Sequence, residues 1–378
     1  MTKLMDVCEL IVDCPHTTAP DEGVGYPLIR TPNIGKGRLI LENVHRVCKE
    51  VYDARNARAI PQVDDIILAR EAPAGNVALI QKGQEVCLGQ RTVLIRADKG
   101  KVNPAYLTYY LLAPKQQHDL KSSANGATVG HINMPRIRGL KIDLPALNIQ
   151  DKIAGILSAY DNLIDNYRRQ IKLLEEAAQR LYKEWFVDLR FPGYEHTKIV
   201  DGVPEGWNMG RLKDIGEFRR GKTITSKHVV KGKIPVVAGG LEPACYHNKF
   251  NTESPVITVS GSGANAGFTR LYNEKVWASD CSFLDASKCD SLYFVYSFLK
   301  SSKAAIDNLQ KGAAQPHVYA KDLNGLAVLI PPNNILAKYS MIVQLYFDKI
   351  KTCQQIIANV QEARDRLLPK LMSGEIKV

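Results

Sequence analysis

The hydrophobic positions of this chain follow two patterns, and the two patterns alternate twice along its length. Short runs rich in Ile and Val, bounded by Gly, Pro or charged residues, predict β-strands. In the first half these runs are 26–30, 65–69, 76–80 and 92–95, and in the second half they are 234–237, 256–259, 267–271 and 281–284. Each set precedes a short helical pattern, at 106–112 and at 293–299, so the sequence predicts two similar α/β units.

The second pattern is a long apolar stretch of helical period that follows each unit. Residues 149–187 form the first stretch, a helix of about 58 Å if it is unbroken. Two stripes of equal period in one chain predict an antiparallel coiled coil that sets the globular units at its opposite ends. The alternative is that each stripe packs on its own unit, which such a long helix would overhang. The predicted seam, position a of both heptads, is Ile153, Tyr160, Tyr167, Leu174, Leu181, Tyr339, Tyr346, Cys353, Val360 and Leu367.

The two halves also repeat residue by residue at an offset of 186 positions. The repeated residues are Gly126, Ala127, His131, Ile132, Leu140, Leu144 and Pro145 in the first copy and Gly312, Ala313, His317, Val318, Leu326, Ile330 and Pro331 in the second. A tandem duplication of this kind predicts a pseudo-two-fold molecule.

The fold class predicted from these patterns is α+β, with two tandem α/β domains separated by two long antiparallel helices. The predicted domain boundaries are 1–147 for the first globular copy, 148–197 for the central helix and linker, 198–331 for the second copy and 332–378 for the last helix. The second copy is shorter in its middle by about twenty residues. We expect the matching segments to form the scaffold and the unlike segments to form the recognition surface, with plain loop-length drift as the alternative.

Composition narrows the class of protein without defining it. The net charge is +11 over 378 residues, and most of the excess lies on the two globular copies, as expected for surfaces that face phosphates. Eight cysteines form no C-x-x-C pair, so we expect reduced and mostly buried thiols and no metal. The sequence shows no apolar stretch of membrane length and no signal peptide, which predicts a cytoplasmic protein.

One motif has the form of a nucleotide-binding loop. Residues 216–223 fit G-x-x-x-x-G-K-T to the letter. A phosphate-binding loop needs a small-residue interior and a helix after it, so that backbone amides converge on the phosphates. Here the interior is bulky and charged, and residues 224–235 do not read as a helix. A nucleotide-using enzyme built on this loop is therefore the alternative to a binding protein, and not the first choice.

Other catalytic motifs are incomplete. Asn103-Pro104-Ala105-Tyr106 resembles the N-P-P-Y motif of adenine methyltransferases but lacks its second Pro. It reads as a helix start, with Asn103 as the cap and Pro104 in the first turn, and Asp290 as the cap at the matching place in the second copy. We therefore expect no catalytic residue in this chain.

The motifs that close each copy are more specific. They are Leu181-Tyr182-Lys183-Glu184-Trp185-Phe186-Val187-Asp188-Leu189-Arg190-Phe191-Pro192-Gly193, then Val203-Pro204-Glu205-Gly206-Trp207, and finally Leu367-Leu368-Pro369-Lys370-Leu371-Met372-Ser373-Gly374-Glu375-Ile376. With these strings in this order, the chain resembles from end to end the DNA specificity subunits of type I restriction-modification systems.

The resemblance implies a function and a set of partners. It implies two target recognition domains, each reading one half of a split sequence in double-stranded DNA, and no chemistry in the chain itself. It also implies two methyltransferase subunits docked on the helices and restriction-translocase subunits that join them, with S-adenosylmethionine, ATP and Mg bound on those partners only. A coiled-coil scaffold that recruits partners without binding DNA is a further alternative.

Reading bases requires forked side chains on loops, and phosphate contacts require Lys, Arg and hydroxyl groups. On this basis the predicted DNA contacts of the first copy are Arg30, Asn33, Lys36, Arg38, Arg70, Gln90, Arg91, Asn125, His131 and Asn133. Those of the second copy are Lys222, Lys227, Lys233, Ser260, Ser262, Asn265, Lys311, Gln315 and His317. The sequence does not divide them into base and phosphate contacts.

Overall fold

The computed structural model describes residues 2–122, 131–312 and 315–378, and the chain divides into two compact units. Unit 1 comprises Met1–Tyr167 with Ile356–Val378, and unit 2 comprises Arg168–Gln355. The predicted DNA contact Asn125 and the repeat members Gly126, Ala127 and Ala313 lie outside the described residues.

The first globular copy is built on two sheets. The larger sheet has the order β2-β8-β5-β6, all antiparallel, and consists of β2 (Cys8–Asp13), β8 (Thr92–Ala97), β5 (Ile66–Ala69) and β6 (Val77–Leu79). The smaller has the order β4-β3-β7, with β3 antiparallel to β4 and parallel to β7. Its strands are β4 (Arg46–Val47), β3 (Tyr26–Ile29) and β7 (Cys87–Leu88). Alternate apolar residues of the larger sheet pack on opposite sides, because side chains alternate along a strand, and this produces two cores.

Short helices surround these sheets. They are α1 (Lys49–Arg55), α2 (Pro104–Leu112), α3 (Pro114–Lys121) and α4 (Met134–Arg138), and the strands β1 (Thr2–Lys3) and β9 (Lys141–Ile142) pair beside them. The predicted cap of α2 is confirmed, since Asn103 Oδ1 accepts a hydrogen bond of 3.0 Å from the backbone N–H of Tyr106.

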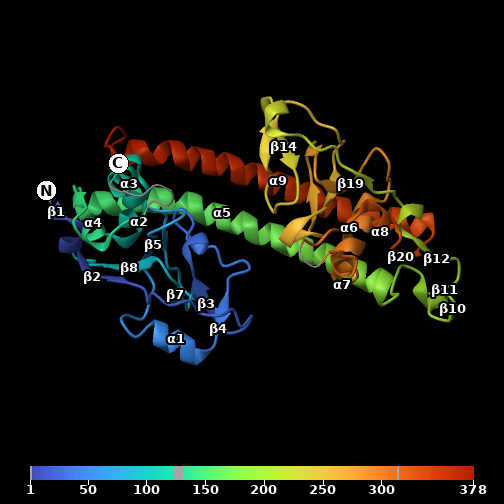
Figure 1. The fold of residues 1–378 in the computed structure, drawn as a ribbon, viewed down its shortest axis with the longest axis horizontal. Coiled ribbons are helices and arrows are strands. Elements are labelled where there is room, and N and C mark those ends of the chain that lie inside the picture. The colour runs from blue at the N-terminus through green and yellow to red at the C-terminus, as the bar shows by residue number, and fades with distance from the viewer. Residues whose placement is uncertain (1, 123–130, 313–314) are drawn as a thin grey trace. The chain divides into compact units, whose positions relative to one another are not determined.

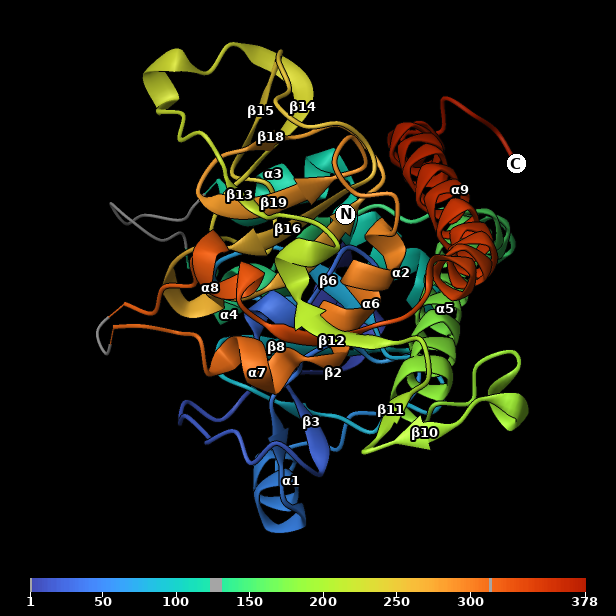
Figure 2. The same ribbon diagram turned by 90° about the vertical axis from the view of Figure 1, so that its right-hand side faces the viewer.

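The second copy repeats this plan strand for strand (Figures 1 and 2). Its larger sheet has the order β13-β19-β16-β17, formed by β13 (Arg219–Arg220), β19 (Cys281–Asp285), β16 (Val256–Ser260) and β17 (Thr269–Tyr272). Its smaller sheet has the order β15-β14-β18, formed by β15 (Cys245–His247), β14 (Lys231–Val237) and β18 (Trp277–Ala278). The pairs β12 (Asn208–Arg211) with β20 (Ala327–Ile330) and β10 (Ile199–Val200) with β11 (Val203–Pro204) complete its strands.

The helices of the second copy are α6 (Leu292–Ser301), α7 (Lys303–Asp307) and α8 (Ala320–Asn324). The predicted cap Asp290 is wrong, because α6 begins one residue later than expected and Ser291 occupies the cap position. The residues by which the middle of this copy is shorter are missing at two places. The connection between β14 and β15 is shorter than that between β3 and β4, and among the described residues nothing between β15 and β16 corresponds to α1.

Two long helices dominate the secondary structure, as the periodicity predicts. The first, α5 (Leu147–Tyr182), continues into a π-helical turn at Lys183–Val187, and the second is α9 (Asn333–Met372). In unit 1 the beginning of α5 packs with the end of α9, around Leu157 and Leu371. In unit 2 the end of α5 packs with the beginning of α9, around Tyr182 and Tyr339, as an antiparallel pairing requires. All ten predicted seam residues are buried or half-buried.

Candidate nucleic-acid interface

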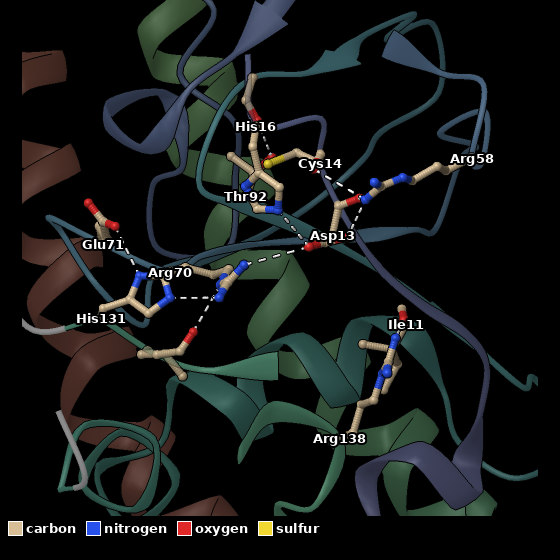
Figure 3. A network of polar contacts seen from close by, with 12 residues as sticks. Ile11, Asp13, Cys14, His16, Arg58, Arg70, Glu71, Thr92, His131 and Arg138 are labelled. Carbon is tan, nitrogen blue, oxygen red and sulfur yellow. Dashed lines mark hydrogen bonds and ion pairs between the residues drawn. The ribbon is translucent and has the colours of Figure 1, made fainter. Parts of the chain in front are cut away.

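Arg70 organises a polar network at the carboxyl end of β5 in the first domain (Figure 3). Its Nε donates to the carbonyl oxygen of Ile132 at 2.9 Å, and its Nη2 lies 2.6 Å from Nε2 of His131. Its Nη1 lies 3.8 Å from an Asp13 carboxylate oxygen at the end of β2. Only 8% of the Arg70 side chain is exposed. Arg70 was a predicted DNA contact, but its burial and these contacts argue that it supports the site from beneath.

The exposed side of this network consists of His131 and Arg91. Both bind Glu71, with His131 Nδ1 at 2.9 Å from one carboxylate oxygen and Arg91 Nη1 at 2.8 Å from the other. His131 is 41% and Arg91 60% exposed at the side chain, and Arg91 has a positive φ of 64° in the turn before β8. Both ring nitrogens of His131 are thus paired, with Glu71 and with Arg70, whereas only Nη1 of the Arg91 guanidinium is paired with a described residue, so Arg91 is the member of this pair with donors left for a nucleic acid.

Asp13 is the second acidic centre of the network. It accepts an ion pair from Arg58, a residue of the segment after α1, and its other oxygen lies 3.0 Å from His16 Nε2 (Figure 3). Gln90 Nε2 donates at 2.9 Å to the His16 carbonyl oxygen, which ties the turn before β8 to the segment after β2. The strand ends of β2, β5 and β8 thus bring together four predicted contacts, Arg70, Gln90, Arg91 and His131, at one edge of the larger sheet.

The predicted contacts after β3 have different fates. Asn33 is 6% exposed, and its Oδ1 accepts from the backbone N–H of Arg30 at 3.1 Å, so it closes a turn and does not face solvent. Arg38 Nε donates to Asp165 at 3.2 Å, and its Nη2 donates to Asn162 at 3.0 Å, so its guanidinium is bound to α5. Lys36 is exposed. Asn133, just before α4, is also exposed.

The second domain has the same backbone frame at the corresponding edge. The backbone N–H of Gly261, directly after β16, donates to the carbonyl oxygen of Asp280. In the first domain the backbone N–H of Arg70, directly after β5, donates to the carbonyl oxygen of Arg91 in the same way. The carbonyl oxygen of Gly261 accepts from Val318, as that of Arg70 accepts from Ile132. These bonds place Gly261 where the first domain has Arg70, Asp280 where it has Arg91, and His317 where it has His131.

The side chains on this shared frame are unlike. The buried arginine is replaced by a glycine, and the exposed Arg91 by Asp280, whose carboxylate accepts a hydrogen bond of 2.6 Å from Ser262 Oγ. Ser260 is 3% exposed and donates to Gly239, so it too supports the site from within. His317 stacks on Tyr319, with ring centroids 5.9 Å apart. The same frame therefore presents two different recognition surfaces.

The other predicted contacts of the second domain lie around this edge without one common network. Lys311 Nζ is 2.8 Å from Asp322, and Asn265 lies in a 3-10 turn at Gly263–Asn265. The predicted residues that are exposed and carry no ion pair to a described residue are Lys222, Lys227, Lys233 and Gln315. All of them stay predictions as DNA contacts.

Residues 216–223 do not form a phosphate-binding loop. Residues Arg219–Arg220 are strand β13, paired with β19, and the segment that follows forms only a 3-10 turn at Ser226–His228. The backbone of Gly221 is packed against β18, where an added Cβ would lie 2.4 Å from the Ser279 carbonyl oxygen. A converging set of free amides and a following helix are both missing from this described segment. The structure also groups no three His, Cys, Asp or Glu residues at metal-binding distance within its described residues.

Four residues at the two recognition edges were not predicted from sequence. In the first domain they are Asp13 and Glu71, which hold predicted contacts, and Arg58, which pairs with Asp13, and in the second domain Asp280, which accepts from the predicted contact Ser262. Three of the four have a sequence feature that could have identified them, because Asp13, Glu71 and Asp280 are charged residues within two positions of a strand end. Arg58 has none, since its partner lies 45 residues away.

Two copies of one α/β domain, joined by long paired helices and carrying unlike polar side chains on one frame, define a tandem recognition protein. The family model described as type I restriction modification DNA specificity domain matches this chain at residues 1–176 and again at 204–377. The chain therefore belongs to the type I restriction-modification DNA specificity family. Its role is that of a specificity subunit, which recognises DNA sequence, and this confirms the expectation from the closing motifs.

Curated relatives and a solved structure agree with this assignment. The chain is 31% identical to the type I restriction enzyme MjaVIII specificity subunit of Methanocaldococcus jannaschii, over 93% of this chain and 86% of the relative. It is 29% identical to the MjaIX specificity subunit of the same organism, over 83% and 78%. The crystal structure of a type I system S subunit from M. genitalium has the same fold, with a TM-score of 0.56 at 19% identity over 98% of this chain and 95% of that one.

One further observation concerns membranes. Among the described residues, none of the helices combines the length and the apolar character needed to cross a bilayer.

Proposed function

We propose that this chain reads a bipartite DNA target, with one half-site read by each domain. The observation that carries this proposal is the pairing of identical backbone hydrogen bonds with unlike side chains, Arg70 against Gly261 and Arg91 against Asp280. A shared frame fixes where each recognition surface lies, and different side chains on it select different bases. Two unlike surfaces on one chain suit a target whose two halves differ.

In this proposal the chain is a non-catalytic subunit. Methyltransferase subunits, two by the symmetry of the repeat, dock on the paired helices, and restriction-translocase subunits join them. S-adenosylmethionine, ATP and Mg then bind to those partners and not to this chain. Since such a complex acts on cellular DNA, we expect it to work in the cytoplasm.

The spacing of the two half-sites provides the direct test. The full-length chain in complex with its methyltransferase subunits is titrated with duplexes that carry the target and with duplexes whose spacer is lengthened by one to five base pairs. We expect strong binding at one spacer and a loss of about 100-fold or more when the second half-site is rotated out of reach, since two-headed binders require a fixed separation of about one helical turn. Equal binding at all spacers would contradict the bipartite reading.

The target itself comes from a second measurement. Methylated adenines in the host genome are mapped with and without this chain. We expect one split motif to lose methylation when the chain is deleted. A variant of the first domain should change only one half of that motif, whereas loss of both halves or of neither would argue against independent reading.

A further inference from the structure

A small basic cavity lies beside the network of the first domain. It has a volume of about 200 Å³, and three arginines line it together with threonines, Gln90 and backbone atoms. The arginines are Arg30 after β3, Arg55 at the end of α1 and Arg91 before β8. No carboxylate is among its lining residues. Gln90 and Arg91 also belong to the network around Asp13 and Glu71, so the cavity and the recognition edge are continuous.

Arg55 forms the floor of this cavity and is 6% exposed. Its Nη1 donates to the Leu88 carbonyl oxygen at 3.1 Å, and its Nη2 donates to that of Thr17 at 2.6 Å. Both acceptors are neutral, and no described carboxylate lies within ion-pair distance of its guanidinium. Burying an uncompensated charge is costly unless a counter-ion completes the site.

Arg30 is the wall of the cavity and is fixed in place. Its backbone N–H donates to Asn33, and its Cγ lies so close to Gly89 that a Cβ at that position would be 2.9 Å away. Its Nε is buried and has no hydrogen-bond partner. The pKa of the Asp21 carboxyl is lowered chiefly by hydrogen bonds from the backbone N–H groups of Arg46 and Gly23, and the positive charge of Arg30 lowers it further. Asp21 does not line the cavity. The Nε is closed to solvent, but the Arg30 side chain also lines the cavity and forms no hydrogen bond or ion pair with a described residue, so its outer nitrogens can bind an acceptor supplied by a ligand.

The chemistry of the site selects an oxyanion. Planar guanidinium groups bind phosphate oxygens through paired hydrogen bonds, and threonine hydroxyls add donors. A cavity of this volume has room for a phosphate group. We propose that the cavity binds a single backbone phosphate of the DNA, next to the half-site read by the first domain. This inference rests on the proposed function, and it assigns an anchoring role that is independent of base sequence.

The anchor is confined to the first domain. In both small sheets the residue directly after the parallel strand donates its backbone N–H to the last residue of the central strand. Gly89 after β7 donates to the carbonyl oxygen of Ile29 in β3, as Ser279 after β18 donates to that of Val237 in β14. This bond places Ala238 where the first domain has Arg30, while the bonds made by the backbone N–H groups of Arg70 and Gly261 place Asp280 where the first domain has Arg91. The second domain thus has an acid and a methyl group where the first has two guanidiniums, so one half of the complex holds the backbone more tightly at this point.

The test uses the full-length chain with its methyltransferase subunits and the variant Arg30→Gln, which removes the charge and keeps most of the side-chain length. Lys82→Gln is the matched control, because Lys82 is exposed in the same domain and does not line the cavity. Binding is measured against salt for the cognate duplex and for one with both half-sites scrambled. We expect Arg30→Gln to reduce the slope of log affinity against log salt by about 0.9 on both duplexes and to leave their affinity ratio unchanged.

A neutral methylphosphonate is then placed at each backbone position of the first half-site in turn. We expect one position to weaken the wild-type and Lys82→Gln complexes several-fold and to leave Arg30→Gln unaffected. An unchanged slope for Arg30→Gln, or no position with this pattern, would overturn the proposal. Failure of the wild-type complex to prefer the cognate duplex would instead refute the proposed function.

A third measurement separates DNA phosphate from free phosphate. Thermal unfolding of the chain is followed in inorganic phosphate and in chloride of equal ionic strength. Stabilisation by phosphate that depends on Arg30, together with the change in the DNA slope, supports the proposal. The same stabilisation with an unchanged DNA slope would identify a free-anion site and would overturn it.

Discussion

Arg364 of α9 forms an ion pair with Asp161 of α5 in the interior of unit 1, where the Asp161 side chain is only 2% exposed. The other oxygen of the Asp161 carboxylate accepts a hydrogen bond of 2.7 Å from Tyr109 Oη on α2. One buried carboxylate therefore connects both long helices to the first domain. Because a charge in this position is stable only with both partners, the contact fixes the register of the helices within this unit.

The internal repeat gives this triad a counterpart in unit 2. At the same offset as Tyr160 and Tyr346, the equivalent of Asp161 is Phe347, and the equivalent of Arg364 is Ala178. Both are buried, and the Phe347 ring lies edge-on to Tyr296, with centroids 5.6 Å apart. A polar triad in one unit thus occupies the place of an apolar cluster in the other.

The replacement of the Asp161–Arg364 ion pair by Phe347 and Ala178 in unit 2 predicts how mutations of the ion pair affect stability. Removal of one partner, by Arg364→Ala or by Asp161→Ala, leaves the other buried and unpaired, and we expect each change to cost about 3–5 kcal/mol in unit 1. The double variant Asp161→Phe with Arg364→Ala copies the apolar pair of unit 2 and should cost less than either single change. Hydrogen exchange of the α2 amides reports the stability of unit 1.

Tryptophan fluorescence supplies the internal control. All three tryptophans, Trp185, Trp207 and Trp277, lie in unit 2, so their unfolding transition should move little in these variants. A double variant less stable in unit 1 than both single variants would show that the two pairs are not interchangeable.

The comparison of Asp161 with Phe347 also shows what the sequence could and could not predict. The eight strand runs identified from the sequence, the two long helices and the internal repeat were predicted correctly, because local periodicity and the offset between copies determine them. Short strands such as β7 and β18 were not predicted, since two residues carry no periodicity. The helix that contains Asp161 was predicted from its apolar period. The partner of Asp161, Arg364, lies 203 residues away, and no local sequence pattern predicts that pairing.

The site was predicted less completely than the fold, for the same reason. Arg70 and Arg91 were chosen as polar residues at strand ends and His131 as part of a separate polar cluster, and the structure brings all three together. Whether a chosen side chain faces solvent depends on tertiary contacts, which bury Arg70 and leave Arg91 exposed. Arg55 had no distinguishing feature in the sequence, since its role comes from carbonyl groups that α1 meets only after folding.

Arg38 offers a test of whether a predicted DNA contact is one. Its guanidinium is bound to Asp165 and Asn162, with 14% of the side chain exposed, so we expect it to hold the loop after β3 against α5. Arg38→Ala should then destabilise unit 1 by about 1–2 kcal/mol and weaken DNA binding without changing its salt slope.

Lys36→Ala is the matched control for Arg38→Ala, since Lys36 lies in the same loop with the same charge and is exposed. If Lys36 contacts a phosphate, its removal should lower the salt slope by about 0.9. A lowered slope for Arg38→Ala would mean that its guanidinium leaves α5 and contacts the DNA in the complex.

The buried cysteines predict a specific dependence of stability on pH. Burial raises the pKa of Cys281 to about 12 and those of Cys87 and Cys289 to about 11, from an ordinary value of 9.0. The folded chain therefore keeps these thiol protons where the unfolded chain loses them. Their contribution to stability is complete below pH 9 and falls by up to about 1.4 kcal/mol per pH unit and thiol as the pH rises toward 11–12.

The variant Cys281→Ala isolates this effect from other groups that titrate in the same range. We expect its free energy of unfolding, measured in urea between pH 8 and 10.5, to decline less steeply than that of the wild type. We also expect Cys87, Cys281 and Cys289 to be alkylated by iodoacetamide at pH 8 only on unfolding. Equal slopes for variant and wild type, or fast alkylation of the folded chain, would contradict the burial of these thiols.

A variant of Lys222 distinguishes a DNA-binding role of this residue from a role in a nucleotide-binding loop. Its backbone is held by β18, since its N–H donates to Ala278 at 2.9 Å and its carbonyl oxygen accepts from Trp277 Nε1 at 2.8 Å. The backbone N–H of Lys222 is therefore not free to donate to a phosphate, while the lysine side chain is exposed. We therefore expect Lys222→Ala to leave any ATP hydrolysis by the purified chain at background and to weaken DNA binding several-fold with a lower salt slope. ATP hydrolysis by the wild-type chain that disappears in this variant would restore the nucleotide-binding loop as a working site.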